Sequence, residues 1–338
     1  MKLALRKTIT PWRLIMLIVI LGIGLFSAFR LSRKHFELAL VNTIPVEQEP
    51  LGLTLSPDFA SLYVANAKSG TISQIDTKSQ RVTKTFPVNP AGRLNSVITS
   101  ADGATLYITD AKAGNVEVLS ASEGRKIFTI PVRLFPQRMA LSRDNTRLYV
   151  VNSASDNVSV IDVTTHALLT NIPVNERPYA IVLAPDNKLA YVTSSQTHTI
   201  TVIDLEAQKP LAPIVLATIT RLTNAVISPD GKYLYVCDAI SNSIVVVDTA
   251  AKTQAQTLNA AKFPKNDLEF SPTDLALSND GKRLYVVGRT GYLSVLNLAD
   301  GVVLASLEVG KDLRNIALTA DGVAYMSSFA TNSVSVVQ

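Results

Sequence analysis

A motif of four short strands recurs seven times between residues 51 and 338, and this repetition limits the fold more than any other feature. Each copy approximates an apolar run, an Asp-containing turn, a Leu-Tyr-Val strand, a Val-Ser-Val-Ile-Asp strand and a strand ending in Ile-Pro-Val. The central Tyr recurs every 40 to 50 residues, at Tyr63, Tyr107, Tyr149, Tyr191, Tyr235, Tyr285 and Tyr325. Such repeats are typical of β-propeller blades. The sequence therefore predicts an all-β fold, a seven-bladed β-propeller of four-stranded antiparallel blades.

An Asp marks the turn before the Leu-Tyr-Val strand of every copy, at Asp58, Asp102, Asp144, Asp186, Asp230, Asp280 and Asp321. In Ser228-Pro229-Asp230-Gly231 the residues stand where a tight turn favours Pro, Asp and Gly. Asn145 and Asn187 replace that Gly in two copies and tolerate a left-handed backbone. We therefore interpret the seven Asp as turn residues and not as active-site acids.

The last copy lacks a fourth strand. Residues 38–46 read Leu-Ala-Leu-Val-Asn-Thr-Ile-Pro-Val and resemble the fourth strands of other copies. We expect residues 38–46 to pair with residues 333–337 and close the ring, which protects strand edges from aggregation. The predicted propeller domain thus covers residues 38–338.

The N-terminal segment is apolar and flanked by positive charge. Residues 14–29 carry no charge, and Arg13 and Arg30 flank them. A helix of this length spans about 24 Å at ~1.5 Å per residue, and flanking Arg side chains can reach the headgroups of a ~30 Å hydrocarbon core. We expect a basic segment at residues 1–13, one N-terminal transmembrane helix that anchors the protein at residues 14–30, and a linker at residues 31–37. A cleaved signal peptide is the alternative, although the apolar run is long for one.

The net charge of +5 belongs to this N-terminal segment. Residues 1–36 contain seven Lys or Arg and no acid, so the rest of the chain has 25 basic and 27 acidic residues. A near-neutral body disfavours nucleic acid as a partner. More Lys and Arg precede the apolar run than follow it, which favours a cytoplasmic N-terminus. We therefore predict a single-pass membrane protein whose propeller lies in the periplasm or elsewhere outside the cytoplasm.

The strand Tyr149-Val150-Val151-Asn152, followed by Val-Ser-Val-Ile-Asp and Ile-Pro-Val, resembles the repeat of the YVTN-repeat β-propeller family, as does Tyr191-Val192-Thr193-Ser194. The resemblance covers residues 38–338. Relatives in the wider group include bacterial surface-layer propellers, lactonase-like proteins and the non-catalytic chain of quinoprotein amine dehydrogenases. The resemblance implies the fold, whereas function has to be argued from a site.

Residue types that carry catalysis or bind metal are sparse. His35, His166 and His198 lie in separate segments and Cys237 is the only cysteine, so no cluster has metal-ligand spacing. A single Cys excludes covalent haem, and a propeller without Trp excludes a Trp-derived quinone. No Gly-x-Ser-x-Gly elbow occurs. We predict no cofactor and no metal, and the sequence favours a binding protein over an enzyme.

Arginines gather in the loops that precede the inner strands, which in a propeller meet at one mouth of the central channel. The residues nine positions before each turn Asp are Glu49, Arg93, Phe135, Arg177, Arg221, Ser271 and Asp312. Our candidate ligand-binding residues are Arg93, Asn95, Arg138, Arg177, Tyr179, Arg221, Asp274 and Arg314. Guanidinium groups suit a carboxylate or phosphate because each can bind two oxygens. The alternative is a set of solvated loop charges paired with local acids.

One loop, residues 259–272, is longer than its counterparts, and long loops on a rigid scaffold often contact partners. The first functional hypothesis is a membrane-tethered, non-enzymatic binding or scaffolding propeller. Its channel mouth and loop 259–272 would bind a protein partner or a small anionic ligand. A lactonase-like hydrolase at the channel mouth is the alternative, because residues on separate loops can converge without a linear motif. A propeller that binds nucleic acid or another anionic ligand is a second alternative.

Overall fold

The computed structural model describes residues 36–217, 221–259 and 271–338. The predicted anchor at residues 14–30 lies outside these ranges, as do residues 1–13, nearly all of the predicted linker and residues 260–270 of the long loop. Within the described ranges, no helix is both long and apolar enough to cross a membrane. Residues 38–338 form one structural unit, to which the following description applies.

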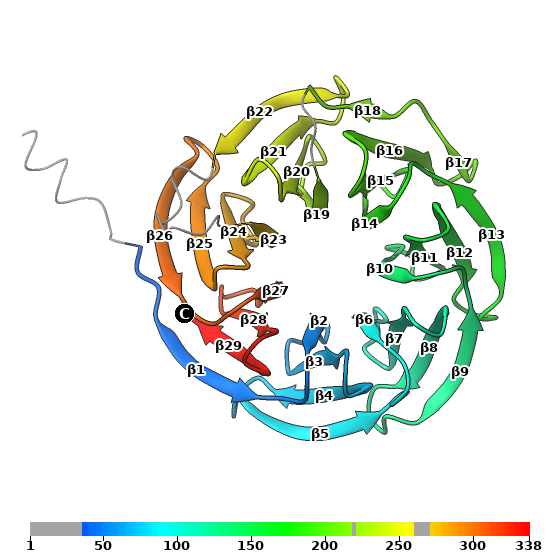
Figure 1. The fold of residues 1–338 in the computed structure, drawn as a ribbon, viewed down its shortest axis with the longest axis vertical. Helices are drawn as coiled ribbons and strands as arrows, with labels where there is room; N and C mark the ends of the chain where they lie inside the picture. Colours follow the sequence, from blue (N-terminus) through cyan, green and yellow to red (C-terminus); the bar gives the residue numbers. More distant parts are fainter. Residues whose placement is uncertain (1–35, 218–220, 260–270) are drawn as a thin grey trace, which may run out of the picture. The chain divides into compact units, whose positions relative to one another are not determined.

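Seven antiparallel sheets stand in a ring, which confirms the predicted seven-bladed β-propeller (Figure 1). The inner strands of blades 1 to 7 are β2 (Pro50–Leu55), β6 (Leu94–Thr99), β10 (Pro136–Leu141), β14 (Pro178–Leu183), β19 (Leu222–Ile227), β23 (Pro272–Leu277) and β27 (Leu313–Leu318). The second strands are β3 (Ser61–Asn66), β7 (Thr105–Asp110), β11 (Arg147–Asn152), β15 (Leu189–Ser194), β20 (Tyr233–Asp238), β24 (Arg283–Gly288) and β28 (Ala324–Ser328). The third strands are β4 (Thr71–Asp76), β8 (Asn115–Ser120), β12 (Asn157–Asp162), β16 (Thr199–Asp204), β21 (Ser243–Asp248), β25 (Tyr292–Asn297) and β29 (Ser333–Val337). The outer strands are β5 (Arg81–Pro87), β9 (Lys126–Pro131), β13 (Leu168–Pro173), the pair β17 (Lys209–Pro210) and β18 (Ile214–Val215), β22 (Thr253–Asn259), β26 (Val302–Glu308) and β1 (Leu40–Pro45).

The outer strand of blade 4 is interrupted. Both of its pieces, β17 and β18, pair with β16. The residues between them end at Pro213, which has no N–H to donate to a strand ladder. The other six sheets keep the four strands that the repeat predicts.

The Tyr that marks each repeat lies in the core between neighbouring blades. Tyr63 of β3 packs in one cluster with Leu94 and Leu106 of blade 2. Tyr107 of β7 packs in the same way with Leu148 of blade 3. All seven marker Tyr are at most 6% exposed. The strongest signal in the sequence is therefore a packing contact that joins one blade to the next.

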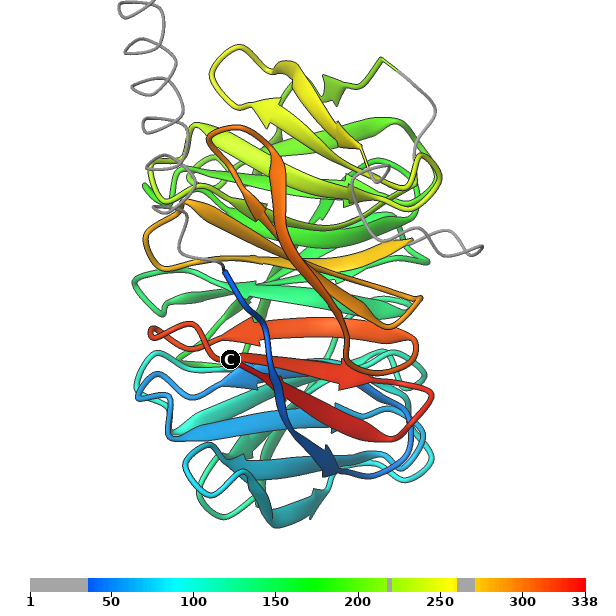
Figure 2. The same cartoon turned by 90° about the vertical axis from the view of Figure 1, so that its left-hand side faces the viewer.

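The first strand completes the last blade. β1 pairs antiparallel with β29, with Leu40 opposite Val337 and Pro45 opposite Ser333. Figures 1 and 2 both show these two strands, coloured blue and red, side by side. Ile44 is buried in the apolar cluster that joins blades 7 and 1. The ring thus closes by pairing the beginning of the propeller with its end.

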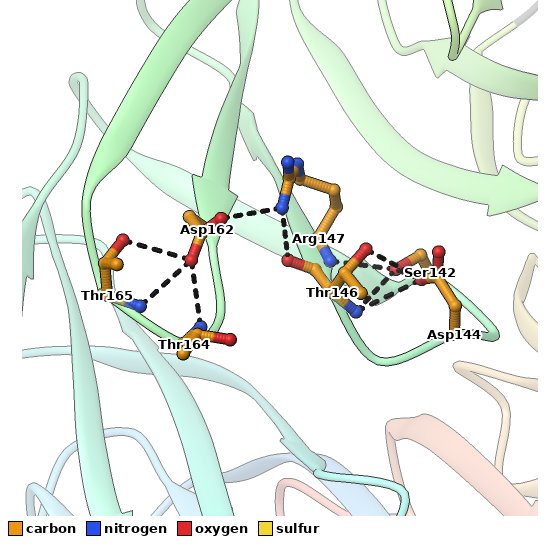
Figure 3. Close-up of polar contacts among 7 residues, drawn as sticks. All are labelled: Ser142, Asp144, Thr146, Arg147, Asp162, Thr164 and Thr165. Carbon is orange, nitrogen blue, oxygen red and sulfur yellow. Dashed lines mark hydrogen bonds and ion pairs between the residues drawn. The ribbon is translucent and has the colours of Figure 1, made fainter.

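A Ser two residues before the turn Asp holds this turn together in five blades. In blade 3, Ser142 Oγ donates to Asp144 Oδ1 at 2.6 Å and accepts from Arg147 N at 2.9 Å (Figure 3). Asp144 Oδ1 also accepts from Thr146 N at 3.1 Å. The hydrogen bonds that the Asp144 carboxylate accepts, from Ser142 first and then from Thr146, lower its pKa. Arg147 Nη1 in turn donates to Asp162 Oδ2 at 2.7 Å and links β11 to β12.

Candidate ligand-binding site

We call the residue directly before each inner strand the pre-strand residue. A hydrogen bond to its backbone carbonyl holds it in place. The carbonyl of Arg177 accepts from Ser195 N at 2.9 Å, and that of Arg221 accepts from Ala239 N at 3.1 Å. The same hydrogen bond to the end of the second strand occurs in all seven blades. Five pre-strand residues have left-handed φ values of 45° to 58°: Glu49, Phe135, Arg177, Ser271 and Asp312. Non-glycine residues keep this conformation where surrounding contacts hold them.

All seven blades contribute to one pocket of about 380 Å³ at the N-terminal ends of the inner strands. The pre-strand residues in its wall are Arg93, Phe135, Arg177, Arg221 and Ser271. The second residues of the inner strands are Leu51, Asn95, Gln137, Tyr179, Thr223, Thr273 and Arg314. Residues directly after second strands add Ser153, Ser195, Ala239 and Arg289. Arg138 and Pro272 complete the lining.

Two of the six pocket arginines are paired with carboxylates on the loops. Arg314 Nη2 lies 2.6 Å from Asp312 Oδ2, and its guanidinium lies 4.7 Å from the centroid of the Phe329 ring. Arg93 Nη1 lies 3.6 Å from Glu49 Oε2. A carboxylate at this distance offsets part of the attraction that each arginine offers to a ligand anion.

A third ion pair joins blades 3 and 6. Arg138 Nη2 of β10 lies 3.8 Å from Asp274 Oδ2 of β23. The Asp274 carboxylate is buried and accepts from Ile316 N at 3.1 Å and from Asn315 Nδ2. Burial raises the pKa of Asp274, and the neighbouring Arg138 acts in the opposite direction. Asp274 is therefore a buried partner of Arg138, outside the set of described residues that line the pocket.

The guanidinium groups of the other three pocket arginines pair with no carboxylate among the described residues, although Arg177 N and Arg221 N donate to Asp156 and Asp238. Arg177, Arg221 and Arg289 form no ion pair within the ranges that the structure describes. They belong to blades 4, 5 and 6, whose inner strands are neighbours in the ring, and all three are exposed. Three neighbouring blades of the pocket thus carry guanidinium groups that form no ion pair with any described residue.

Seven of the eight residues chosen from the sequence line the pocket, namely Arg93, Asn95, Arg138, Arg177, Tyr179, Arg221 and Arg314. Their role in binding stays a prediction. The structure places Asp274 beneath Arg138 as its partner instead. Sequence reasoning missed Arg289, which follows a second strand and does not precede an inner one. Aligning the repeats at this position, where Ser153, Ser195 and Ala239 stand in other blades, would have found it.

The only cysteine lies in the core, and the described residues form no metal-binding cluster. Cys237 is fully buried, and burial raises the pKa of its thiol well above the ordinary value. In the described part of the chain, no three His, Cys, Asp or Glu side chains come together in a way that would hold a metal ion. The chemistry that the pocket offers most clearly is hydrogen bonding and charge attraction to an anion.

The ring of sheets and the pocket on its axis define the chain as a β-propeller protein. Over residues 38–322 the sequence matches the YNCE-like beta-propeller family, and the chain belongs to that family. This match confirms the resemblance to YVTN-repeat β-propellers that the sequence predicted. No curated protein matches the chain.

The fold is shared with solved structures of different sequence. A chain of the hydrazine synthase of Kuenenia stuttgartiensis superposes with a TM-score of 0.76 at 20% identity. The similarity covers 90% of this chain and 97% of that chain. At this level of identity the similarity shows the fold alone.

Proposed function

We propose that this protein is a non-enzymatic binding propeller whose axial pocket takes a small anionic ligand. The observation that carries the proposal is the arc formed by Arg177, Arg221 and Arg289, which line the pocket and whose guanidinium groups have no carboxylate partner among the described residues. Each guanidinium group can donate two parallel hydrogen bonds to a carboxylate or phosphate. Three such groups on neighbouring blades suit one compact acidic group.

The charge balance of the pocket supports the same proposal. Among the described residues, six arginines line the pocket, and the guanidinium groups of three of them form ion pairs with carboxylates while those of the other three form none. In a partly enclosed pocket the effective dielectric constant is lower than in bulk water, so charges act on one another more strongly. An anion in the pocket would offset the repulsion between neighbouring guanidinium groups.

A lactonase-like hydrolase is the alternative that the sequence leaves open, and no feature of the described pocket favours it. Metal-dependent hydrolysis would need free carboxylates as ligands. Glu49, Asp274 and Asp312, which the sequence places nearest the pocket, each face an arginine. We therefore retain ligand binding as the proposed function.

The cellular setting of the propeller is a further part of the proposal. We propose that residues 14–30 tether the protein to a membrane and that the propeller lies outside the cytoplasm. We also propose that loop 259–272 is a second binding surface, which contacts a protein partner. Sequence patterns alone support these three statements, through the uncharged run, its basic flanks and the apolar residues of the long loop.

Thermal unfolding of the full chain in mild detergent tests ligand binding. The panel contains carboxylates, sugar phosphates, lactones, divalent cations and oligonucleotides. A ligand at ~100 times its Kd adds about 2.7 kcal/mol to the free energy of unfolding, so an anion of the correct class should raise the unfolding midpoint by several degrees. The double substitution Arg177→Ala and Arg221→Ala should abolish this increase. It should leave the ligand-free midpoint unchanged, because both side chains are exposed.

A matched control removes the same charge elsewhere. Arg81 and Arg143 are exposed residues that do not line the pocket. The Arg81→Ala and Arg143→Ala double variant should keep the full increase in midpoint. An anion-induced increase that survives the loss of Arg177 and Arg221 would contradict the proposal. A response to lactones and divalent cations alone would favour the hydrolase.

A further inference from the structure

The pocket presents apolar side chains as well as arginines. Blades 4 to 6 supply the three arginines whose guanidinium groups lack a carboxylate partner in the described ranges. Blade 3 supplies Phe135 and blade 1 supplies Leu51, so apolar surface lines another part of the same pocket. Phe135 is 42% exposed, which leaves much of its ring open to a ligand. A ligand that meets only the arginines would leave this apolar surface in water.

Phe135 is held in place although its side chain is exposed. It adopts a left-handed backbone conformation, with φ of 57°. Its carbonyl accepts from Ser153 N at 3.0 Å, and the next residue, Pro136, is buried at the start of β10. The backbone that carries the ring is therefore fixed before a ligand arrives. Binding then has no backbone of Phe135 to order, and covering the ring removes apolar area from water.

We propose that the ligand is an organic anion with one acidic head group and one flat apolar body. The head group binds Arg177, Arg221 and Arg289, and the body covers the ring of Phe135. This inference rests on the proposed function and narrows it to a class of ligand. The pocket volume of about 380 Å³ falls within the range of small-molecule sites.

The distribution of charge argues against two other classes of anion. An inorganic anion would satisfy the arginines and leave Phe135 exposed to water. A ligand with several separated acidic groups would need a second uncompensated cluster, whereas Arg93 and Arg314 are already paired with Glu49 and Asp312. A single acidic head joined to an apolar body matches both the arginines and the apolar side chains of the pocket.

Calorimetric titration of the full chain in mild detergent tests the inference with two matched pairs of compounds. Phenyl phosphate is compared with methyl phosphate, and benzoate with acetate, so that each pair shares a head group and differs in its apolar body. We expect the aromatic member of at least one pair to bind at least tenfold more tightly. Phe135→Ala should reduce the ratio of the two affinities in that pair to less than twofold. It should leave the affinity for the smaller compound unchanged.

Phe59 provides a control that matches Phe135 in exposure and backbone conformation. It is 40% exposed with φ of 58°, and it does not line this pocket. Phe59→Ala should keep the full ratio. Equal affinity within both pairs, or a ratio that persists in Phe135→Ala, would overturn the inference and leave anion binding intact. Binding of none of the four compounds would also overturn the inference, and the proposed function would fall with it only if no anion of the thermal-unfolding panel raised the midpoint.

Discussion

At the scale of single residues, one Ser–Asp pair stabilises the same turn in five of the seven blades. The Ser hydroxyl is the leading cause of the lowered pKa of the turn Asp in five blades, at Asp58, Asp102, Asp144, Asp230 and Asp280. A hydrogen bond to the charged carboxylate favours that form and also ties the turn to the next strand. In blade 4, Ala184 takes the place of the Ser, and Asp186 accepts from Lys188 N at 3.0 Å.

Ser142→Ala should destabilise the propeller by about 1–2 kcal/mol, because it removes a donor to Asp144 and an acceptor for Arg147 N. Urea unfolding measures the change. Titration of the Asp144 carboxyl by NMR should show its pKa rising toward the ordinary value. An unchanged free energy of unfolding and an unchanged pKa would together contradict this account.

Blade 4 offers the converse experiment. Ala184→Ser supplies the hydroxyl that the other turns have, at a buried site close to Asp186. It should raise the free energy of unfolding by about 0.5–1 kcal/mol, which urea unfolding measures. Destabilisation by both Ser142→Ala and Ala184→Ser would mean that side-chain packing, and not the hydroxyl, governs these turns.

The sequence predicts some pocket residues and not others. Arg177 and Arg221 could be predicted because both stand at a fixed distance from a turn Asp, and that distance is local in the sequence. The contact between Arg138 and Asp274 depends on the angle between blades 3 and 6, which no local pattern encodes. Arg289 reaches the pocket from a different loop of its blade, so its distance from a turn Asp does not predict it.

At the scale of elements, the outer strands depend on very few buried side chains. In β1 the burial pattern leaves only Ile44 fully buried, and in β9 and β13 the matching residues are Ile130 and Ile172. One side chain per strand therefore supplies most of the apolar contact with the rest of the blade. The repeat predicted these strands from their Ile-Pro-Val endings, because that Ile is the residue that packs inward. The interruption between β17 and β18 has no counterpart in the other blades, and the shared pattern could not predict it.

Ile44→Ala should destabilise the propeller by about 2–5 kcal/mol, because it opens a cavity in the cluster that joins blades 7 and 1. Val41→Ala on the same strand is the control, since Val41 is 44% exposed, and it should change stability by no more than about 0.5 kcal/mol. Urea unfolding of both variants gives the comparison. Equal effects would show that the pairing of β1 does not depend on the side chain of Ile44.

At the scale of the whole molecule, carboxylates determine how the stability of the fold changes in acid. Among the described residues, seven Asp have pKa values lowered below the ordinary 3.8, at Asp58, Asp76, Asp102, Asp144, Asp162, Asp230 and Asp280. A group with a lowered folded pKa stabilises the fold above its unfolded pKa, and this stabilisation is lost as pH falls through the folded value. Asp274 acts in the opposite direction because its pKa is raised by burial. The lowered pKa values of the hydrogen-bonded Asp predict that acid weakens the fold.

The unfolding midpoint should therefore stay nearly constant from pH 8 to about pH 5 and fall steadily below about pH 4. Calorimetric scans in buffers of constant ionic strength measure this profile. Asp274→Asn should leave the fall below pH 4 in place, because the seven turn and loop carboxylates are unchanged. A midpoint that rises between pH 5 and pH 3 would contradict the effect of the lowered pKa values described above.

The pairing of β1 with β29 also determines when the protein can finish folding during its synthesis. Asn332 Oδ1 accepts from Glu49 N close to the point of closure, across 283 residues of chain. A ribosome working at ~5–20 residues per second needs roughly 15–60 s to make that stretch. Throughout this interval β1 has no partner, and the edge of each newly made blade stays open to strands from neighbouring nascent chains. Slow translation of the last blade would therefore lengthen the period in which the protein is most prone to misassembly.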